Sequence, residues 1–333
     1  RGLMYSFEPT EEQQMLMDAV GKYAANDLRP AAREAEERGE LLHKLLSRGW
    51  EIGLLQASIP EAYGGFGERS AVTGVLAIEE MVFGDLAGTL AVLTPSLFAT
   101  PILLAGSEEQ KQEYLLGAIE GKWTPFTAAL IEYAFDFDPN DLKTTAALQG
   151  NEYVLNGEKA FVSFAKDAEH ILVYANLEGQ TQGFIVSKES TGLMVSDERE
   201  KLMSLNALPL YRVHLEDVRV PVAQRLGGPE GHDFEPILAS LRVATAAAAV
   251  GVANAAFEYS KDYAREREAF GVKIAQKQAI AFMRESGRFQ GAEADDLLDR
   301  IAMWPGQLTS YDSGGLEIMA LRREAEQALG DRF

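Results

Sequence analysis

The chain has 333 residues, of which 47% are hydrophobic, and its formal net charge is −20. A chain of this length can bury a large core and is expected to form two or three domains. Its 51 acidic residues outnumber the 31 basic ones. This charge repels nucleic acid and anionic membranes, so neither is an expected partner. A nucleotide ligand is still compatible with it where a few arginines and helix N-termini converge.

Cysteine and histidine, which commonly hold metals or form disulfides, are absent or scarce. The chain has no cysteine, which excludes disulfides and thiol nucleophiles. Its four histidines are not arranged in a metal-binding spacing, so no metal centre is expected. We find no apolar run near the roughly 20 residues of a membrane span and no signal-peptide pattern, and we expect a cytoplasmic protein.

The first third of the sequence predicts helices. Thr10 and Ser107 each precede a helix start, and a glutamine three residues later completes a capping box. Residues 59–67 are rich in Gly and Pro and predict a loop. The almost uncharged run 88–105 predicts a helical core. We place the end of this helical domain at residue 122, so it comprises residues 1–122.

Short strand patterns follow the helices. Residues 153–163 give the clearest strand signal, with two β-rich runs separated by Asn156-Gly157. This dipeptide tolerates the positive φ of a tight turn and predicts a β-hairpin. Further short strands separated by turn residues predict an antiparallel barrel or sandwich. Pro221 closes the β region because proline cannot donate to a ladder, and we assign residues 123–228 to this middle domain.

A long helix is predicted from residue 234 to about residue 267. Its interior is made of small residues from 244 to 256, which let helices approach closely and are typical of the centre of a bundle. A further helix is predicted over 274–283. We therefore expect an incomplete C-terminal helical bundle over residues 229–283 and a divergent helical tail over residues 284–333.

The order of these motifs resembles the acyl-CoA dehydrogenase family over about residues 7–283. The matching segments are Ile-Pro-Glu-Ala-Tyr-Gly-Gly at 59–65, Gly-Ser-Glu-Glu-Gln-Lys at 106–111, Leu-Lys-Thr-Thr-Ala at 142–146, Leu-Asn-Gly-Glu-Lys at 155–159, Glu-Asp-Val-Arg-Val-Pro at 216–221 and Ala-Arg-Glu-Arg-Glu-Ala-Phe-Gly at 264–271. The resemblance implies an α+β fold with an N-terminal helical domain, a middle antiparallel β-barrel or sandwich, and a C-terminal helical bundle that is truncated here.

The same resemblance implies FAD as the cofactor, held between the middle domain and the bundle of a homo- or hetero-oligomer. Phe161 matches an aromatic residue against the flavin ring, and Ser163 matches a hydroxyl near N5 that can stabilise charge on the ring. Arg267 matches an arginine that binds the FAD pyrophosphate, a role that suits a bidentate guanidinium. Gln278 matches a glutamine that contacts FAD, and Arg242 matches an arginine beside the acyl-CoA pocket.

The implied reaction is the α,β-dehydrogenation of an acyl-CoA thioester, with an electron-transfer flavoprotein as partner. Two departures from the family concern this chemistry. The glutamate that serves as base in the family is absent, and its alternative position on the long helix holds Ser240, a poor proton acceptor. Residues 132–138 read Glu-Tyr-Ala-Phe-Asp-Phe-Asp where the family has Glu-Pro-x-Ala-Gly-Ser-Asp. The added bulk and negative charge oppose recognition of the CoA phosphates.

Two functions therefore stay open. The first is an FAD-dependent oxidoreductase whose base comes from an unlocated residue or from a partner chain. The second is a non-catalytic scaffold that binds acyl-CoA or a partner protein. Retention of Phe161, Ser163 and Arg267 favours the first, whereas the missing glutamate and Asp136-Phe137 favour the second.

The tail has a resemblance of its own. Residues 303–307, 310–311, 321–326 and 329–333 resemble a segment of an uncharacterised bacterial family related to zinc peptidases, but the zinc-binding His/Glu motif is absent and no peptidase activity is expected. Helices over 293–301 and 316–329 are expected to pack where the missing bundle helices would be. An uncovered face would leave a large apolar patch, so this tail, a second copy of the chain or another chain must cover it.

Overall fold

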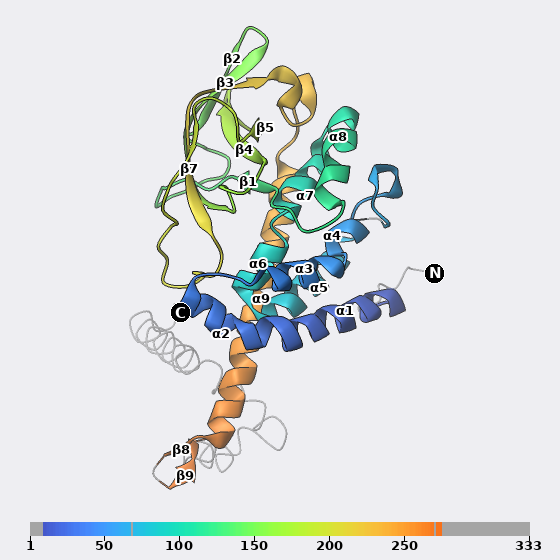
Figure 1. Ribbon diagram of the computed structural model, residues 1–333, viewed down its shortest axis with the longest axis vertical. Coiled ribbons are helices and arrows are strands. Elements are labelled where there is room, and N and C mark those ends of the chain that lie inside the picture. The colour runs from blue at the N-terminus through green and yellow to red at the C-terminus, as the bar shows by residue number, and fades with distance from the viewer. Residues whose placement is uncertain (1–8, 68, 270, 275–333) are drawn as a thin grey trace, which may run out of the picture. The chain divides into compact units, whose positions relative to one another are not determined.

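The computed structural model describes residues 9–67, 69–269 and 271–274 (Figure 1). The chain forms two compact units, residues 1–252 and residues 253–333. The helices predicted beyond residue 274 and the whole divergent tail lie outside the described residues.

Helices make up the first third of the chain. They are α1 (Glu11–Tyr23), η1 (Ala24–Leu28), α2 (Arg29–Arg38), α3 (His43–Glu51), α4 (Leu54–Ala57), η2 (Glu61–Tyr63), α5 (Ala71–Gly84), α6 (Leu86–Val92), α7 (Ser96–Ala105) and α8 (Glu108–Ile119). Both predicted capping boxes are confirmed. The side chains of Thr10 and Ser107 accept the N–H groups of Gln13 and Gln110, whose side chains bond back to the cap residues.

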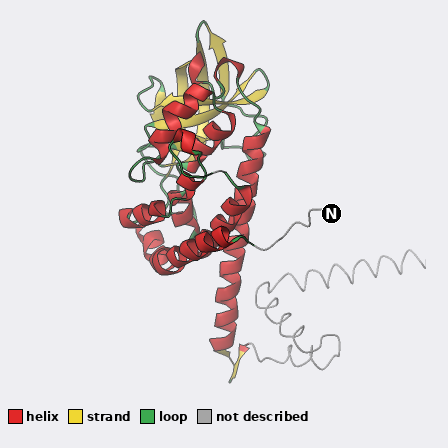
Figure 2. Cartoon of the chain, turned by 90° about the vertical axis from the view of Figure 1, so that its right-hand side faces the viewer, coloured by secondary structure: helices red, strands yellow, loops and turns green. Residues whose placement is uncertain are grey.

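A single seven-stranded sheet follows in the same unit. Its strands are β1 (Thr127–Ala129), β2 (Thr145–Gln149), β3 (Glu152–Ser163), β4 (His170–Leu177), β5 (Gln180–Ser187), β6 (Leu193–Val195) and β7 (Leu210–Pro221). The order is β1-β4-β2-β3-β7-β6, with β5 paired to β4. Most pairs are antiparallel as predicted, but β4 pairs in parallel with β1 and β2. Figure 2 shows the strands gathered at one end of this unit.

The predicted hairpin around Asn156-Gly157 is wrong. β3 is one continuous strand of 12 residues, and the hairpin turn lies earlier, at Gly150, where Gln149 pairs with Glu152. Asn156 instead lies at a register shift between β3 and β7, where its side chain accepts the N–H of Asp217 at 2.8 Å. Pairing with β7 therefore overrides the local preference of Asn-Gly for a turn.

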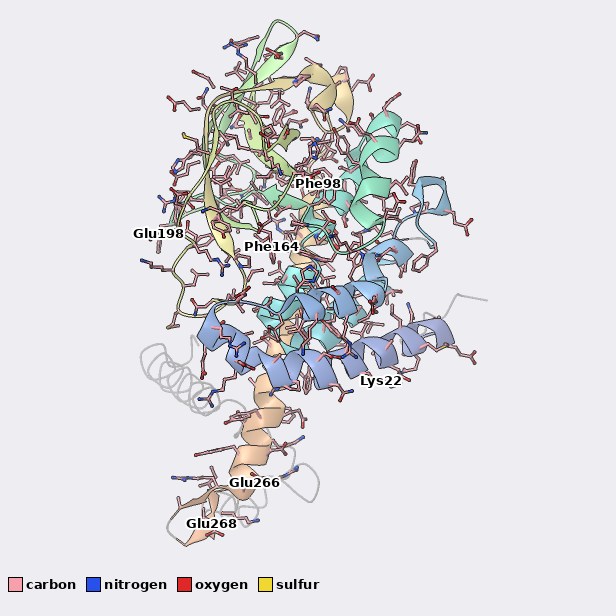
Figure 3. The ribbon with its side chains drawn as sticks, in the orientation of Figure 1. Lys22, Phe98, Phe164, Glu198, Glu266 and Glu268 are labelled. Atoms are coloured by element: carbon pink, nitrogen blue, oxygen red, sulfur yellow. The ribbon has the colours of Figure 1, made fainter. Side chains whose placement is uncertain are left out.

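Aromatic side chains join the helices to the sheet. Phe98 of α7 packs against Phe126 with ring centroids 5.2 Å apart, and Trp123 packs against Phe164 at 4.9 Å. The Trp123 ring also donates to the backbone oxygen of Val92 at 3.2 Å. Figure 3 shows Phe98 and Phe164 where the helices meet the sheet. Each buried aromatic side chain contributes about 2 kcal/mol, so this seam fixes the sheet against the helices.

The long helix α9 (Glu235–Glu266) follows the sheet. In the first unit its buried residues are Ile237, Leu238, Ala247 and Gly251, of which Ile237, Ala247 and Gly251 share one face at helical spacing. A Cβ added at Gly251 would lie 2.5 Å from the backbone oxygen of Glu79, so α9 and α5 approach closely. This contact confirms the predicted role of small residues at this point of the helix.

By length and composition alone, α9 is apolar enough to cross a membrane, and so is the pair α6 and α7 if its 50° bend is counted as one span. This finding, which covers only the described part of the chain, corrects the expectation that no apolar run approaches that length. Ala and Val dominate the run. The centre of a helical bundle has the same character, so these two properties do not assign α9 to a membrane.

The described part of the second unit is short. The last turns of α9 lead into β8 (Glu268–Ala269) and β9 (Val272–Lys273), which pair antiparallel. Gly271 lies between them with φ of +80°. In these turns the rings of Tyr259 and Tyr263 stack with centroids 6.5 Å apart.

Candidate functional site

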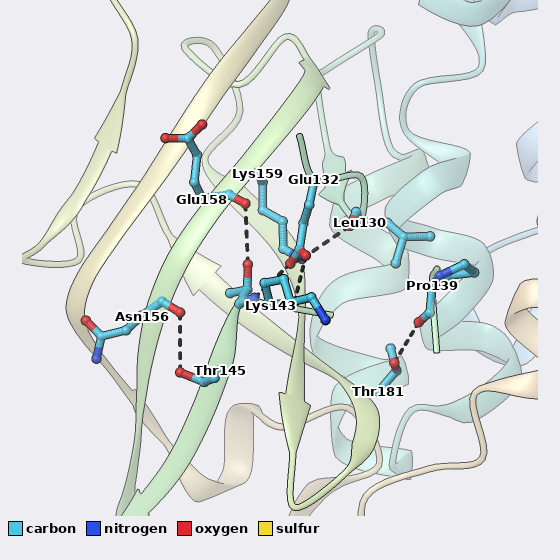
Figure 4. Close-up of polar contacts among 10 residues, drawn as sticks. Leu130, Glu132, Pro139, Lys143, Thr145, Asn156, Glu158, Lys159 and Thr181 are labelled. Carbon is cyan, nitrogen blue, oxygen red and sulfur yellow. Dashed lines mark hydrogen bonds and ion pairs between the residues drawn. The ribbon is translucent and has the colours of Figure 1, made fainter. Parts of the chain in front are cut away.

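A buried ion pair anchors the loop that connects β1 to β2 (Figure 4). The Lys159 ammonium donates to a carboxylate oxygen of Glu132 at 2.7 Å and to the backbone oxygen of Leu130 at 3.2 Å. The Glu132 carboxylate also accepts the backbone N–H groups of Lys143 at 2.7 Å and Thr144 at 2.9 Å. Both ends of the loop are thereby tied to β3.

The protonation states of this pair follow from its surroundings. Burial alone would raise the pKa of Glu132, but the hydrogen bonds from Lys159, Thr144 and Lys143 outweigh it and lower the pKa. Burial lowers the pKa of Lys159 to about 8, against the opposing effect of Glu132. Glu132 is thus held as a fully bonded carboxylate, which makes it a poor acceptor for a substrate proton.

The ion pair lies next to a bulge in β3. The register between β3 and β7 shifts between Lys159 and Val162, and Phe161 takes φ of +56°. Such a backbone conformation is strained for a bulky residue and persists only where its surroundings enforce it. Here the N–H of Ala160 donates to the backbone oxygen of Ile131 at 2.8 Å and fastens the bulge to the anchored loop. Bulges of this kind redirect a side chain, and this one redirects Phe161.

The redirected Phe161 ring belongs to a small aromatic group. It lies beside Tyr133 of the anchored loop, with ring centroids 5.4 Å apart and an interplanar angle of 55°. The guanidinium of Arg212 on β7 lies over the Tyr133 ring, 4.4 Å from its centroid. Phe161 stays half-buried, so part of an aromatic surface is presented at the end of the strand.

Two residues further on, Ser163 takes part in a buried group of hydroxyls. Its Oγ lies 3.2 Å from Thr127 Oγ1 and 3.5 Å from Thr94 Oγ1. Thr94 uses its own proton for the backbone oxygen of Leu90 at 2.8 Å. The bond between Ser163 and Thr127 needs one of their two protons, so the second can serve another acceptor. A half-buried aromatic ring and a hydroxyl donor on one strand fit the face and the ring nitrogen of a flavin.

The comparisons with known proteins decide the family. Models of the N-terminal, middle and C-terminal domains of acyl-CoA dehydrogenases match residues 10–122, 129–218 and 234–286. A probable acyl-CoA dehydrogenase of Bacillus subtilis (strain 168) is 35% identical over 289 residues, which cover 83% of this chain and 74% of that protein. The chain belongs to the acyl-CoA dehydrogenase family.

Other relatives agree with this assignment. Butyryl-CoA dehydrogenase from Megasphaera elsdenii superposes with a TM-score of 0.72 at 26% identity, covering 91% of this chain and 82% of that chain. The caffeyl-CoA reductase-Etf complex subunit CarC of Acetobacterium woodii is 32% identical over 286 residues, covering 82% of this chain and 74% of that protein. The expected fold, the FAD cofactor and the class of acyl-CoA dehydrogenase-like oxidoreductases are thereby confirmed.

The C-terminal residues 270–333 also match a model described as a bacterial protein of unknown function. This match agrees with the predicted resemblance of the tail to an uncharacterised bacterial family. Its relation to zinc peptidases stays a prediction.

The remaining site residues predicted from the acyl-CoA dehydrogenase resemblance lie in three places. Ser240 and Arg242 are on the first-unit part of α9, where Ser240 Oγ accepts a hydrogen bond from Arg69 at 2.8 Å and Arg242 is exposed. Arg267 is exposed in the second unit, with its backbone N–H bonded to the oxygen of Tyr263. Gln278 lies outside the described residues. Phe161 and Ser163 therefore lie together on β3, but the described residues do not bring all the predicted site residues into one site.

Sequence reasoning missed two features of this acyl-CoA dehydrogenase-like site. Lys159 and Glu132 both stand in quoted segments, but they are 27 residues apart and no local pattern pairs them. Tyr133 stands in the departing segment 132–138 and has no role assigned from the sequence, although an aromatic residue in place of proline is a usable signal.

Proposed function

We propose that this chain catalyses the α,β-dehydrogenation of an acyl-CoA thioester with bound FAD. FAD supplies the ring that accepts the hydride in this chemistry. Phe161 would lie against that ring, and Ser163 would donate a hydrogen bond near N5, where negative charge develops. The observation that carries the proposal is the strained bulge of β3 at Phe161. Two residues later, the hydroxyl of Ser163 can still donate a hydrogen bond.

The remaining predicted residues complete the proposed site. Arg267 and Gln278 would hold the FAD pyrophosphate and the rest of the dinucleotide, because a guanidinium binds a diphosphate through two parallel bonds. Arg242 would lie beside the acyl-CoA substrate, and its exposure leaves its charge available for this role. The site would be completed in a homo- or hetero-oligomer in the cytoplasm.

The proton acceptor is proposed to come from a residue not yet located or from a partner chain. Ser240 has no adjacent base among its described contacts, and its hydroxyl already accepts from Arg69. Glu132, the carboxylate next to the aromatic group, is fully engaged by Lys159 and two backbone N–H groups. A base must be free to take up the α-proton, so neither residue suits the role.

An electron-transfer flavoprotein is the proposed partner for reoxidation of the site. The similarity to a subunit of a caffeyl-CoA reductase-Etf complex supports this proposal. Such a partner would take up the electrons that bound FAD receives from the substrate and so ready the site for the next turnover.

A specific observation favours the second candidate, a non-catalytic scaffold. The loop after Glu132 carries Asp136, Asp138 and Asp141. Its one lysine, Lys143, is paired with Asp141 at 2.7 Å. This negative charge beside the aromatic group opposes the phosphates of CoA.

The absorbance spectrum of the purified full-length chain tests the proposal. We expect a yellow protein whose flavin band bleaches when a suitable acyl-CoA is added without oxygen. The Ser163→Ala variant should bleach more slowly, and Arg267→Ala should hold less FAD after dialysis. Ser187→Ala, at the end of β5, is the matched control and should behave as the parent protein. A colourless chain that takes up no added FAD would overturn the proposal in favour of the scaffold.

A further inference from the structure

Tyr133 has no assigned role, yet it is the residue that contacts Phe161. It stands where the family resemblance expects a proline, in the anchored loop between β1 and β2. We propose that Tyr133 and Phe161 together form the surface that contacts the flavin ring, so that Tyr133 is a further FAD-binding residue. This inference rests on the proposed function and extends it to a residue particular to this chain.

The first argument is that Tyr133 is held in place while much of its surface stays exposed. Arg212 lies over the ring at 4.4 Å and Phe161 lies beside it at 5.4 Å. The guanidinium is itself flanked by the carboxylates of Glu158 at 3.5 Å and Glu200 at 3.6 Å. Tyr133 nevertheless keeps 46% of its surface exposed. A fixed aromatic ring that stays exposed is a preorganised surface for a flat ligand.

The second argument is that one set of backbone contacts positions both rings. Glu132, the residue before Tyr133, is bonded to Lys159, which stands two residues before Phe161. Between them the N–H of Ala160 donates to the oxygen of Ile131 at 2.8 Å. The loop and the bulge are thereby fixed in register, so the distance between the two rings is set by the fold.

The third argument is the contrast with Phe135, two residues further along the loop. Its side chain is fully exposed, whereas Tyr133 is packed between an arginine and a phenylalanine. The two bulky side chains of this loop therefore lie in different environments. Phe135 serves as the control for any effect that comes from the loop alone.

Flavin fluorescence tests the proposed contact, because a merely structural role of Tyr133 would not change the emission of bound flavin. A phenol in contact with a flavin quenches its fluorescence, whereas a phenyl ring at the same place does not. FAD is titrated into the full-length apoprotein, and both affinity and the emission of bound flavin are recorded. Tyr133→Phe should keep the affinity within about twofold, because the ring is retained, and bound flavin should emit several-fold more strongly. Tyr133→Ala should weaken FAD binding about tenfold, a loss typical of a removed aromatic contact.

Two control variants isolate the contact. Phe135→Ala should leave affinity and emission unchanged. Tyr63→Phe removes a phenol that bonds to Glu108 at 3.0 Å on the helical side, and it should not change the emission. Thermal unfolding of each variant shows whether the Tyr133→Ala protein is folded, and Tyr133→Phe decides the question if it is not.

The outcomes separate this inference from the proposed function. If the parent protein binds FAD and Tyr133→Phe emits no more strongly than it does, the role of Tyr133 is overturned while the flavin site at Phe161 and Ser163 stands. If the parent protein binds no FAD, both proposals fall together.

Discussion

The Lys159 ammonium lies 2.7 Å from the Glu132 carboxylate, and the two side chains are 0% and 7% exposed. Removing two charges from water is costly, and their attraction offsets that cost only when the remaining donors and acceptors are also satisfied. Here Leu130, Lys143 and Thr144 supply those further hydrogen bonds. The pair therefore specifies how the loop is placed on β3 more than it adds to net stability.

A double-mutant cycle tests this view of the ion pair. Lys159→Met alone leaves a buried carboxylate without its cation and should lower the free energy of unfolding by about 3–5 kcal/mol. Adding Glu132→Gln removes the unpaired charge and retains an acceptor for one of the two backbone N–H groups, so it should recover part of that loss. Urea unfolding measures all the variants. Losses that simply add in the double variant would show that the two side chains are not coupled.

The exposed pair of Arg219 and Glu152 is the matched control for the cycle. Its atoms are 3.4 Å apart, and the side chains are 56% and 43% exposed. Solvent screens such a pair, so Arg219→Met should cost less than about 1 kcal/mol.

His232 predicts a pH dependence of stability. Its Nδ1 lies 3.3 Å from the oxygen of Leu226, while its Nε2 is buried without a partner among the described residues. Burial lowers the pKa of His232 to about 4, against the opposing effect of the bond to Leu226. The unfolded chain therefore binds this proton first as the pH falls, and stability is lost between about pH 6.5 and pH 4.

The His232→Leu variant measures this contribution. Over this pH range the free energy of unfolding of the parent protein should fall by about 2 kcal/mol more than that of the variant. This figure allows for partial exposure of the ring. The two proteins are compared by urea unfolding at pH 7, 5.5 and 4. Equal losses in both would show that another group is responsible.

Features set by contacts between neighbouring residues could be predicted from the sequence, whereas features set by contacts between distant segments could not. The capping boxes at Thr10 and Ser107 were predictable because every contact is made within four residues. The turn at Asn156-Gly157 was not, because β7 pairs with this segment from about 60 residues away and imposes a register shift. The site divides in the same way. Phe161 and Ser163 follow from one motif, whereas Lys159 and Tyr133 matter through residues distant in sequence.

Gly150 lies in the observed hairpin turn, whereas Gly157 lies inside β3, where the sequence predicts a turn. Gly150 has φ of +66° with nothing within 4 Å of an added Cβ, whereas a Cβ at Gly157 would lie 2.6 Å from Thr144 Cα. Gly150→Ala should cost about 1 kcal/mol, the strain of a left-handed residue. Gly157→Ala should cost at least about 3 kcal/mol, because a backbone clash adds to its own strain at φ of +149°. Thermal unfolding ranks the two, and the reverse order would restore the turn at Asn156-Gly157.

The contact between α9 and α5 gives the last prediction. A Cβ at Gly251 would lie 2.5 Å from the backbone oxygen of Glu79 and 3.0 Å from Val82 Cβ, so Gly251→Ala forces the helices apart. We expect a loss of about 1–3 kcal/mol, which exceeds the helix propensity gained by replacing glycine. Gly74→Ala on α5 is the matched control, since nothing lies within 4 Å of its added Cβ, and it should stabilise the protein by about 0.5–1 kcal/mol. Urea unfolding of both variants separates propensity from packing: a gain at both positions would mean that α9 does not pack against α5 as closely as described.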